Sequence, residues 1–178
     1  MKANSTNNIQ SLSEQEIASH KALINFGEDD AKLLKAHAAT IAKQLDTIVD
    51  RFYDYQLSIP EVKAVISVDE RLPRLKETMK QYITELFSGD YGMKYVERRL
   101  EVGRVHENLG VSARFYLSAA YQLENLLRET IDNITDANNA PLRSALSKVM
   151  RFDVQIIMDT YIESLLSKVH TAQEELED

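Results

Sequence analysis

Apolar residues recur every three or four positions along most of this chain, and the residues that would interrupt such a spacing are scarce. The 178 residues include only five glycines and three prolines. Spacings of three and four place side chains on one face of an α-helix, whereas a strand requires alternation. One clear stripe consists of Leu72, Leu75, Met79, Tyr82 and Leu86. The pattern predicts an all-α fold, and the length indicates one domain.

Composition excludes several classes of function. The net charge of −7 argues against nucleic-acid binding, which needs clustered Lys and Arg. The absence of cysteine excludes disulfide bonds, thiolate metal ligands and thiol nucleophiles. The N-terminus lacks the apolar run of a signal peptide, and no stretch approaches the roughly 20 apolar residues of a membrane span. We therefore expect a cytoplasmic protein that binds neither nucleic acid nor membranes.

The chain divides into a polar N-terminus, a helical domain and an acidic end. We expect disorder over residues 1–10, one domain over 11–173, and a short acidic end over 174–178. Helical periodicity over 31–56 fits one helix or two. Signals for helix starts, which are capping hydroxyls, first-turn prolines or acidic residues, occur at Ser11–Glu14, Ser58–Glu61, Asp69 with Pro73, Ser112 and Asn138–Pro141.

The last predicted helix, which reaches about Gln173, is apolar on two sides. One stripe contains Val149, Phe152 and Ile156. The other contains Val154, Ile157, Met158, Tyr161, Leu165 and Val169. A helix of this kind needs two partners. One is the domain core, and we expect the other to be a second copy of the chain; a central helix in a larger monomer is the alternative.

His106 is the residue to which the sequence draws most attention. Val102, His106 and Leu109 share one helical face that is otherwise apolar, and Gly110 ends the helix directly afterwards. A histidine in apolar surroundings is a candidate ligand, although most lone histidines are exposed or hydrogen-bonded in a core. We expect the other three, His20, His37 and His170, to be exposed.

Four segments carry a resemblance to a known family. Residues 49–53, 75–78, 105–111 and 114–116 resemble the sensor domain of globin-coupled sensors, and the likeness extends over about 28–169. It implies a globin-like fold with an additional N-terminal helix that dimerises through its last two long helices. It implies one non-covalently bound haem b, with His106 as the proximal iron ligand. It also implies that Tyr53 is the distal tyrosine that hydrogen-bonds bound oxygen, and that Tyr116 lies near the histidine.

The expected haem contacts are Tyr53, Leu75, Thr78, Met79, Tyr82, Val102, Leu109 and Tyr116. Two of these residues could instead have purely structural roles. Tyr53 could be a core tyrosine bonded to a backbone carbonyl, and the Thr78 hydroxyl could bond to its own helix.

We therefore interpret the chain as a haem-based sensor of O2, with CO and NO as further ligands, and not as an enzyme. The family's last helix leads to an output domain, of which a diguanylate cyclase is the form we consider first. The acidic end is expected to lead toward such a domain, which this sequence lacks. A haem-free globin-like domain used for dimerisation or scaffolding is the main alternative. An oxygen-handling enzyme ranks last, because no flavin or nicotinamide motif is present.

Overall fold

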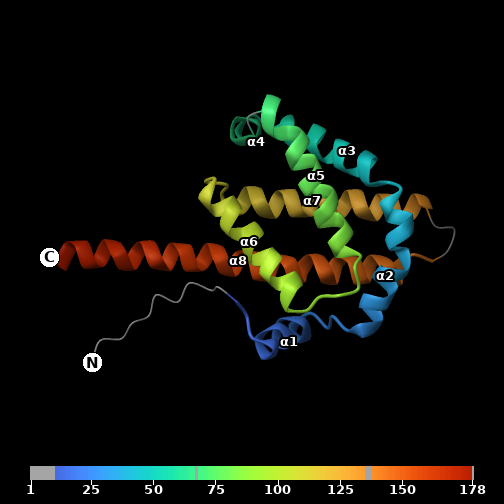
Figure 1. Cartoon of the computed structure of the whole chain (residues 1–178), viewed down its shortest axis with the longest axis horizontal. Coiled ribbons are helices and arrows are strands. Elements are labelled where there is room, and N and C mark those ends of the chain that lie inside the picture. The colour runs from blue at the N-terminus through green and yellow to red at the C-terminus, as the bar shows by residue number, and fades with distance from the viewer. Residues whose placement is uncertain (1–10, 67, 135–137, 178) are drawn as a thin grey trace.

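The computed structural model describes residues 11–66, 68–134 and 138–177, and every regular element in those ranges is an α-helix (Figure 1). The expected all-α class is confirmed. The helices are α1 (Glu14–Leu23), α2 (Glu28–Ala42), α3 (Leu45–Leu57), α4 (Pro60–Ile66), α5 (Val68–Leu86), α6 (Met93–Asn108), α7 (Ala113–Ile134) and α8 (Ala140–Glu177). Residues 1–10, which we expected to be disordered, lie outside the described ranges.

The capping box that opens α1 lies two residues later than expected. Glu16 accepts a hydrogen bond from the backbone N–H of Ser13 at 2.8 Å, and Ser13 Oγ accepts one from the N–H of Glu16 at 3.3 Å. The predicted pair was Ser11 and Glu14. The later register places Leu12 among the buried core residues just before the helix, and this burial favours Ser13 as the cap.

The periodic segment over 31–56 contains two helices. The N–H of Gln44 bonds to the carbonyl of Ile41 at 2.8 Å, and this turn separates α2 from α3. After the turn the chain meets different neighbours: α2 packs against α8, whereas α3 packs against α5 and α7. The apolar period continues through the bend because both helices bury one face, so the sequence alone could not locate it.

Two other helix signals have different roles from those expected. Ser58 Oγ donates to the carbonyl of Tyr55 at 2.6 Å, so Ser58 closes the end of α3 and does not cap α4. Asp69 lies in the first turn of α5, as predicted, but Pro73 lies in the second turn and does not mark the start. A proline inside a helix leaves one carbonyl without its helical partner, which local sequence rules would have disfavoured.

Helix α8 forms the centre of the domain. It packs along α6, α7 and α2, and its residues Val149, Phe152 and Ile156 are completely buried. In Figure 1 it runs alongside α7 and then continues well past the other helices toward the C-terminus. The first predicted stripe of α8 therefore belongs to the core.

The second stripe of α8 becomes exposed toward the C-terminus. Ile157 is buried, but Leu165 and Val169 are 63% and 48% exposed. The adjacent Ile162 and Leu166 are exposed as well. Within the described part of the chain, this end of α8 is apolar and uncovered.

Helices α5 and α6 rest on different parts of the domain. α5 packs against α3 and α2, whereas α6 packs mainly against α8. The stripe of α5 is fully buried only at its end: Leu86 is 0% exposed, whereas Leu72, Leu75, Met79 and Tyr82 are partly buried. The two helices that carry most of the predicted site therefore have different main packing partners.

Candidate functional site

His106 lies in the last turn of α6 with one ring nitrogen fixed and the other free. Nδ1 is 2.8 Å from the carbonyl oxygen of Val102, one turn earlier in the same helix. Because a carbonyl can only accept, Nδ1 must carry the hydrogen. In the neutral ring Nε2 then holds a lone pair, and no described residue forms a hydrogen bond with it. In this tautomer Nε2 can bind a metal ion.

The surroundings of His106 keep its ring neutral. Partial burial lowers the pKa of His106 from its ordinary value of 6.5. This effect of burial outweighs that of the hydrogen bond to Val102, which would raise the pKa. The ring meets that of Tyr116 on α7 edge to face, with centroids 5.3 Å apart. Tyr116 is buried, and this burial raises its pKa, so its hydroxyl stays protonated. The predicted neighbours His106 and Tyr116 are thus in contact.

Two other histidines, His20 and His37, make the same local bond. His37 Nδ1 lies 2.9 Å from the carbonyl of Leu33, again four residues earlier. The bond alone therefore does not distinguish His106. What distinguishes it is the edge-to-face contact with Tyr116 and the desolvation that lowers its pKa.

Tyr53 and Leu75 form a second group of predicted site residues. Tyr53 is buried on α3, and its hydroxyl donates to the carbonyl of Leu75 on α5 at 3.2 Å. Burial raises the pKa of Tyr53 to about 12, so the phenol is a donor at neutral pH. This geometry corresponds to the alternative role of Tyr53, a core tyrosine bonded to a backbone carbonyl.

The remaining predicted contacts differ in exposure and partner. Thr78 is exposed and donates to the carbonyl of Arg74 in its own helix at 3.0 Å. Met79 and Val102 are partly buried, and Leu109 is 53% exposed. No hydrogen bond or ring contact between described residues joins the Tyr53 group directly to His106.

Tyr82 belongs to a buried ionic cluster that sequence reasoning missed. Its hydroxyl donates to Asp153 on α8 at 2.7 Å, and the Tyr95 hydroxyl donates to the other carboxylate oxygen at 2.6 Å. Arg99 Nε also donates to Asp153, at 2.7 Å, and its Nη1 donates to Glu85 at 2.6 Å. Arg99 and Asp153 are 1% and 0% exposed.

The guanidinium of Arg99 is also enclosed by aromatic rings. It lies 4.2 Å from the ring centre of Tyr82 and 4.1 Å from that of Tyr95. The cluster joins α5, α6 and α8, so it fixes the helix of His106 against the core. Sequence spacing provided no signal for it, because its charged residues come from three separate helices.

Helix α8 also contacts the chain immediately after His106. The Tyr161 hydroxyl donates to the carbonyl of Val111 at 2.8 Å. Ser164 Oγ donates to Glu107 at 2.7 Å, and Lys168 pairs with the same carboxylate oxygen. The end of α6 is therefore held by the outer part of α8.

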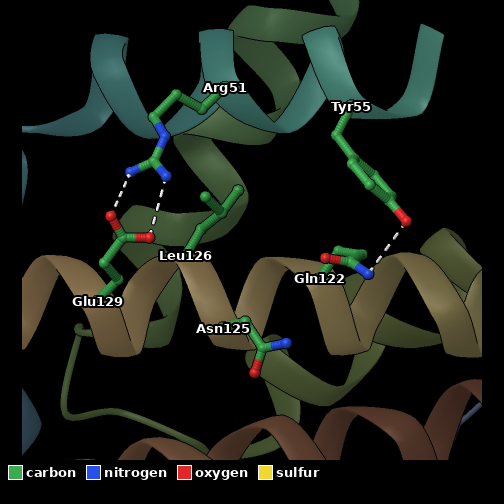
Figure 2. Close-up of a pocket in the computed structure, with 6 residues that line it drawn as sticks. All are labelled: Arg51, Tyr55, Gln122, Asn125, Leu126 and Glu129. Carbon is green, nitrogen blue, oxygen red and sulfur yellow. Dashed lines mark hydrogen bonds and ion pairs between the residues drawn. The ribbon is translucent and has the colours of Figure 1, made fainter. Parts of the chain in front are cut away.

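A surface hollow lies elsewhere. Figure 2 shows it between α3 and α7, with Arg51 paired to Glu129 and Gln122 bonded to Tyr55. Its volume is about 310 Å³, and Asn125 and Leu126 complete its lining. His106 does not line it, and none of the predicted haem contacts does.

The described residues provide no ready-made metal cage. They contain no group of three or more His, Cys, Asp or Glu side chains placed to hold a metal ion. A metal at His106 would therefore have to be supplied with most of its ligands, as in a porphyrin. Among the same residues, no helix combines the length and the apolar character needed to cross a membrane.

Comparison with known proteins identifies the class. The globin domain of a Geobacter sulfurreducens globin-coupled sensor superposes with a TM-score of 0.76 at 27% sequence identity, covering 84% of this chain and 98% of that one. The all-helical fold is therefore that of a globin, and α1 is its additional N-terminal helix.

The chain belongs to the Protoglobin family, whose sequence profile matches residues 13–167. It is also 28% identical over 171 residues to the heme-based aerotactic transducer HemAT of Halobacterium salinarum. That match covers 89% of this chain and 35% of the transducer, so the chain spans about a third of the length of this relative. The resemblance to globin-coupled sensors noted in the sequence is confirmed.

Proposed function

We propose that this chain is the haem-binding domain of a cytoplasmic gas sensor, with O2 as its main ligand and CO and NO as others. The proposal rests on a partly buried, neutral His106 whose Nδ1–H is fixed by Val102 and whose Nε2 is hydrogen-bonded to none of the described residues. The transducer related to this chain is described as heme-based, which supports the same cofactor here. Because the chain has no cysteine, the haem would be of the non-covalent b type.

The side chains around His106 and along α5 fit such a group. His106 supplies the nitrogen ligand, and its hydrogen bond to Val102 sets both the tautomer and the ring direction. Partly buried apolar residues on α5, including Leu75 and Met79, and Val102 and Leu109 at the end of α6 offer the apolar walls that a porphyrin needs. When bound, haem supplies a ferrous iron that coordinates a diatomic gas.

Tyr53 would provide the preference for oxygen. Its hydroxyl is a protonated donor, and its present bond to the Leu75 carbonyl is long, at 3.2 Å. By exchanging that carbonyl for a partly anionic gas ligand, Tyr53 would gain a charge-assisted hydrogen bond. Bound CO is less polarised than bound O2, so it would gain less from this hydrogen bond. Thr78 could donate as well, after giving up its bond to Arg74.

The sensor would act as a homodimer that signals to an output domain. The exposed apolar end of α8, with Leu165 and Val169, supports pairing with a second copy. Globin-coupled sensors carry their outputs on the same chain, and a diguanylate cyclase is the output we propose first. The domain itself would bind and report, without catalysis.

Spectroscopy of a histidine variant tests the cofactor. The purified chain, reconstituted with haemin and reduced, should show a Soret band and a five-coordinate ferrous spectrum that changes with O2 and CO. His106→Ala should lose these features while keeping its helical circular dichroism. His37→Ala is the matched control, because His37 makes the same bond to its own helix. A His106→Ala protein with an unchanged spectrum would refute the assignment.

The same experiment separates the haem-free alternative. If the wild type binds no haemin and still sediments as a dimer, the domain serves association only. If it binds haemin through His106, the sensor proposal stands.

A further inference from the structure

Tyr161 of α8 is connected to His106 by two routes. In the first, the Tyr161 hydroxyl donates to the carbonyl of Val111 at 2.8 Å, and the N–H of Val111 donates to the carbonyl of His106 at 3.0 Å. In the second, the Tyr161 ring lies 6.3 Å from that of Tyr116, which in turn meets the His106 ring at 5.3 Å. One side chain therefore touches both the backbone and the aromatic surroundings of the histidine.

The turn between these contacts has its own backbone hydrogen bonds but few side-chain contacts. Leu109 is half exposed, and Gly110, with φ of +73°, has no side chain to pack. Ser112 Oγ is buried without a hydrogen-bond partner among the described residues. The Tyr161 hydroxyl is thus the main side-chain anchor for the carbonyl of Val111. Since burial raises the pKa of Tyr161 to about 12, that hydroxyl stays protonated at neutral pH.

Glu107, the residue after His106, provides a second attachment to α8. It accepts from Ser164 and pairs with Lys168, three and seven residues beyond Tyr161. Positions 161, 164 and 168 lie on one face of the helix. The Lys168 side chain is mostly exposed, so this pair is weaker than its short distance suggests. The Tyr161 contact is the better shielded of the two attachments.

We propose that Tyr161 is a positioning residue for His106: by holding Val111 and Tyr116, it sets the orientation of the imidazole, so that α8 and the proximal ligand move together. The consequence for a bound haem rests on the function proposed above. Coupling of this kind is reciprocal: a change at His106 must affect α8, and a change in α8 must affect His106. A shift of His106 would thus reach α8 at Tyr161, which lies where the apolar stripe of α8 becomes exposed.

Tyr161→Phe tests this directly, because it removes the hydroxyl and keeps the ring. Tyr121→Phe is the matched control, since Tyr121 is an exposed tyrosine on α7. The first readout is amide hydrogen exchange over residues 107–112 in the haem-free chain. Loss of one hydrogen bond should speed exchange there about fivefold, the equivalent of ~1 kcal/mol, with no change in the control.

The second readout is the iron–histidine stretching band of the ferrous, haemin-reconstituted protein. Tyr161→Phe should bind as much haem as the wild type but show a shifted or broadened band, which the control should not. If exchange and band both match the wild type, Tyr161 does not position His106. If exchange rises but neither protein binds haem, the positioning role stands and the proposed cofactor fails.

Discussion

Gly103 of α6 faces Thr160 of α8 so closely that a Cβ at position 103 would overlap with Oγ1 of Thr160 and lie only 3.0 Å from its Cγ2. The two helices cross where both backbones approach, three residues before His106. This crossing allows α6 to lie deep against α8, with Tyr95, Arg99 and Leu100 fully buried.

Gly103→Ala should therefore destabilise the domain, although alanine normally favours a helix. We expect a loss of about 1–3 kcal/mol in the free energy of unfolding, because the clash forces the helices apart. Urea denaturation measures it. Adding Thr160→Ala removes Oγ1 and Cγ2. The double variant should therefore lose less unfolding free energy than the two single variants lose together. A Gly103→Ala protein as stable as the wild type would show that the crossing is looser than described.

Tyr53→Phe should speed the release of oxygen. Loss of a hydrogen bond to a charged acceptor is worth about 1.5–3 kcal/mol, which corresponds to roughly one to two decades in rate. CO release should change less. Stopped-flow kinetics measure both release rates. Tyr55→Phe is the control, because Tyr55 is a partly exposed tyrosine on the same helix. Equal oxygen release from Tyr53→Phe and wild type would remove Tyr53 from ligand discrimination.

Asp153→Asn should be among the most damaging changes in the chain. It leaves the buried guanidinium of Arg99 without the carboxylate that accepts from its Nε. Breaking a buried pair on one side costs about 3–5 kcal/mol, which denaturant unfolding should detect. Asp132→Asn breaks a half-exposed pair with Arg143 and should cost less than about 1 kcal/mol. Similar losses in both variants would contradict the role given to the buried cluster.

His20 should make the stability of the haem-free domain depend on pH. Both of its ring nitrogens face acceptors, the Glu16 carbonyl at 2.8 Å and the Asp159 carboxylate at 3.1 Å, so the folded state favours the imidazolium. Burial opposes this, but the hydrogen bonds prevail and raise the pKa of His20 above its ordinary 6.5. The stabilisation is therefore complete below pH 6.5 and is lost as the pH rises through the folded-state value.

Urea unfolding of wild type and His20→Ala across about pH 5.5 to 8 measures this effect. The difference in unfolding free energy should shrink toward high pH. His106 acts in the opposite direction: its lowered pKa removes stability as the pH falls through 6.5, in both proteins alike. His170→Ala, at an exposed site, is the control. A difference that stays constant over the range would show that folding does not raise the pKa of His20.

Leu165→Glu should convert the proposed dimer to monomers. It places a charge in the centre of the exposed apolar stripe on α8. Sedimentation velocity of the wild type and the variant at equal concentration provides the measurement. Leu23→Glu, on the exposed side of α1, should remain dimeric. Should the wild type itself sediment as a monomer, association through α8 would be wrong.

The sequence was sufficient for most of the longer helices, because they bury a stripe at helical spacing, but it did not locate the bend between α2 and α3. It also located His106, since a histidine on the apolar face that Val102 and Leu109 share stands out from its neighbours. The contact of His106 with Tyr116 came from the family resemblance and is present in the structure.

What the sequence could not supply are pairings between distant charges. Arg99 and Asp153 are 54 positions apart, and His20 and Asp159 are 139 apart. Each of these residues fits an ordinary solvated helix face, which is why we expected His20 to be exposed; instead it is partly buried. Such pairs depend on how helices cross, and a periodic pattern carries no information about crossing angles.

The length of α8 has a mechanical consequence. From Tyr161 to Glu177 the helix continues for about 24 Å at 1.5 Å per residue, with no proline or glycine to bend it. A tilt of about 5° at Tyr161 would displace the far end by about 2 Å, since the displacement grows with the length of the helix beyond that point. A small movement of α8 near Tyr161 would therefore become a larger one at its C-terminal end.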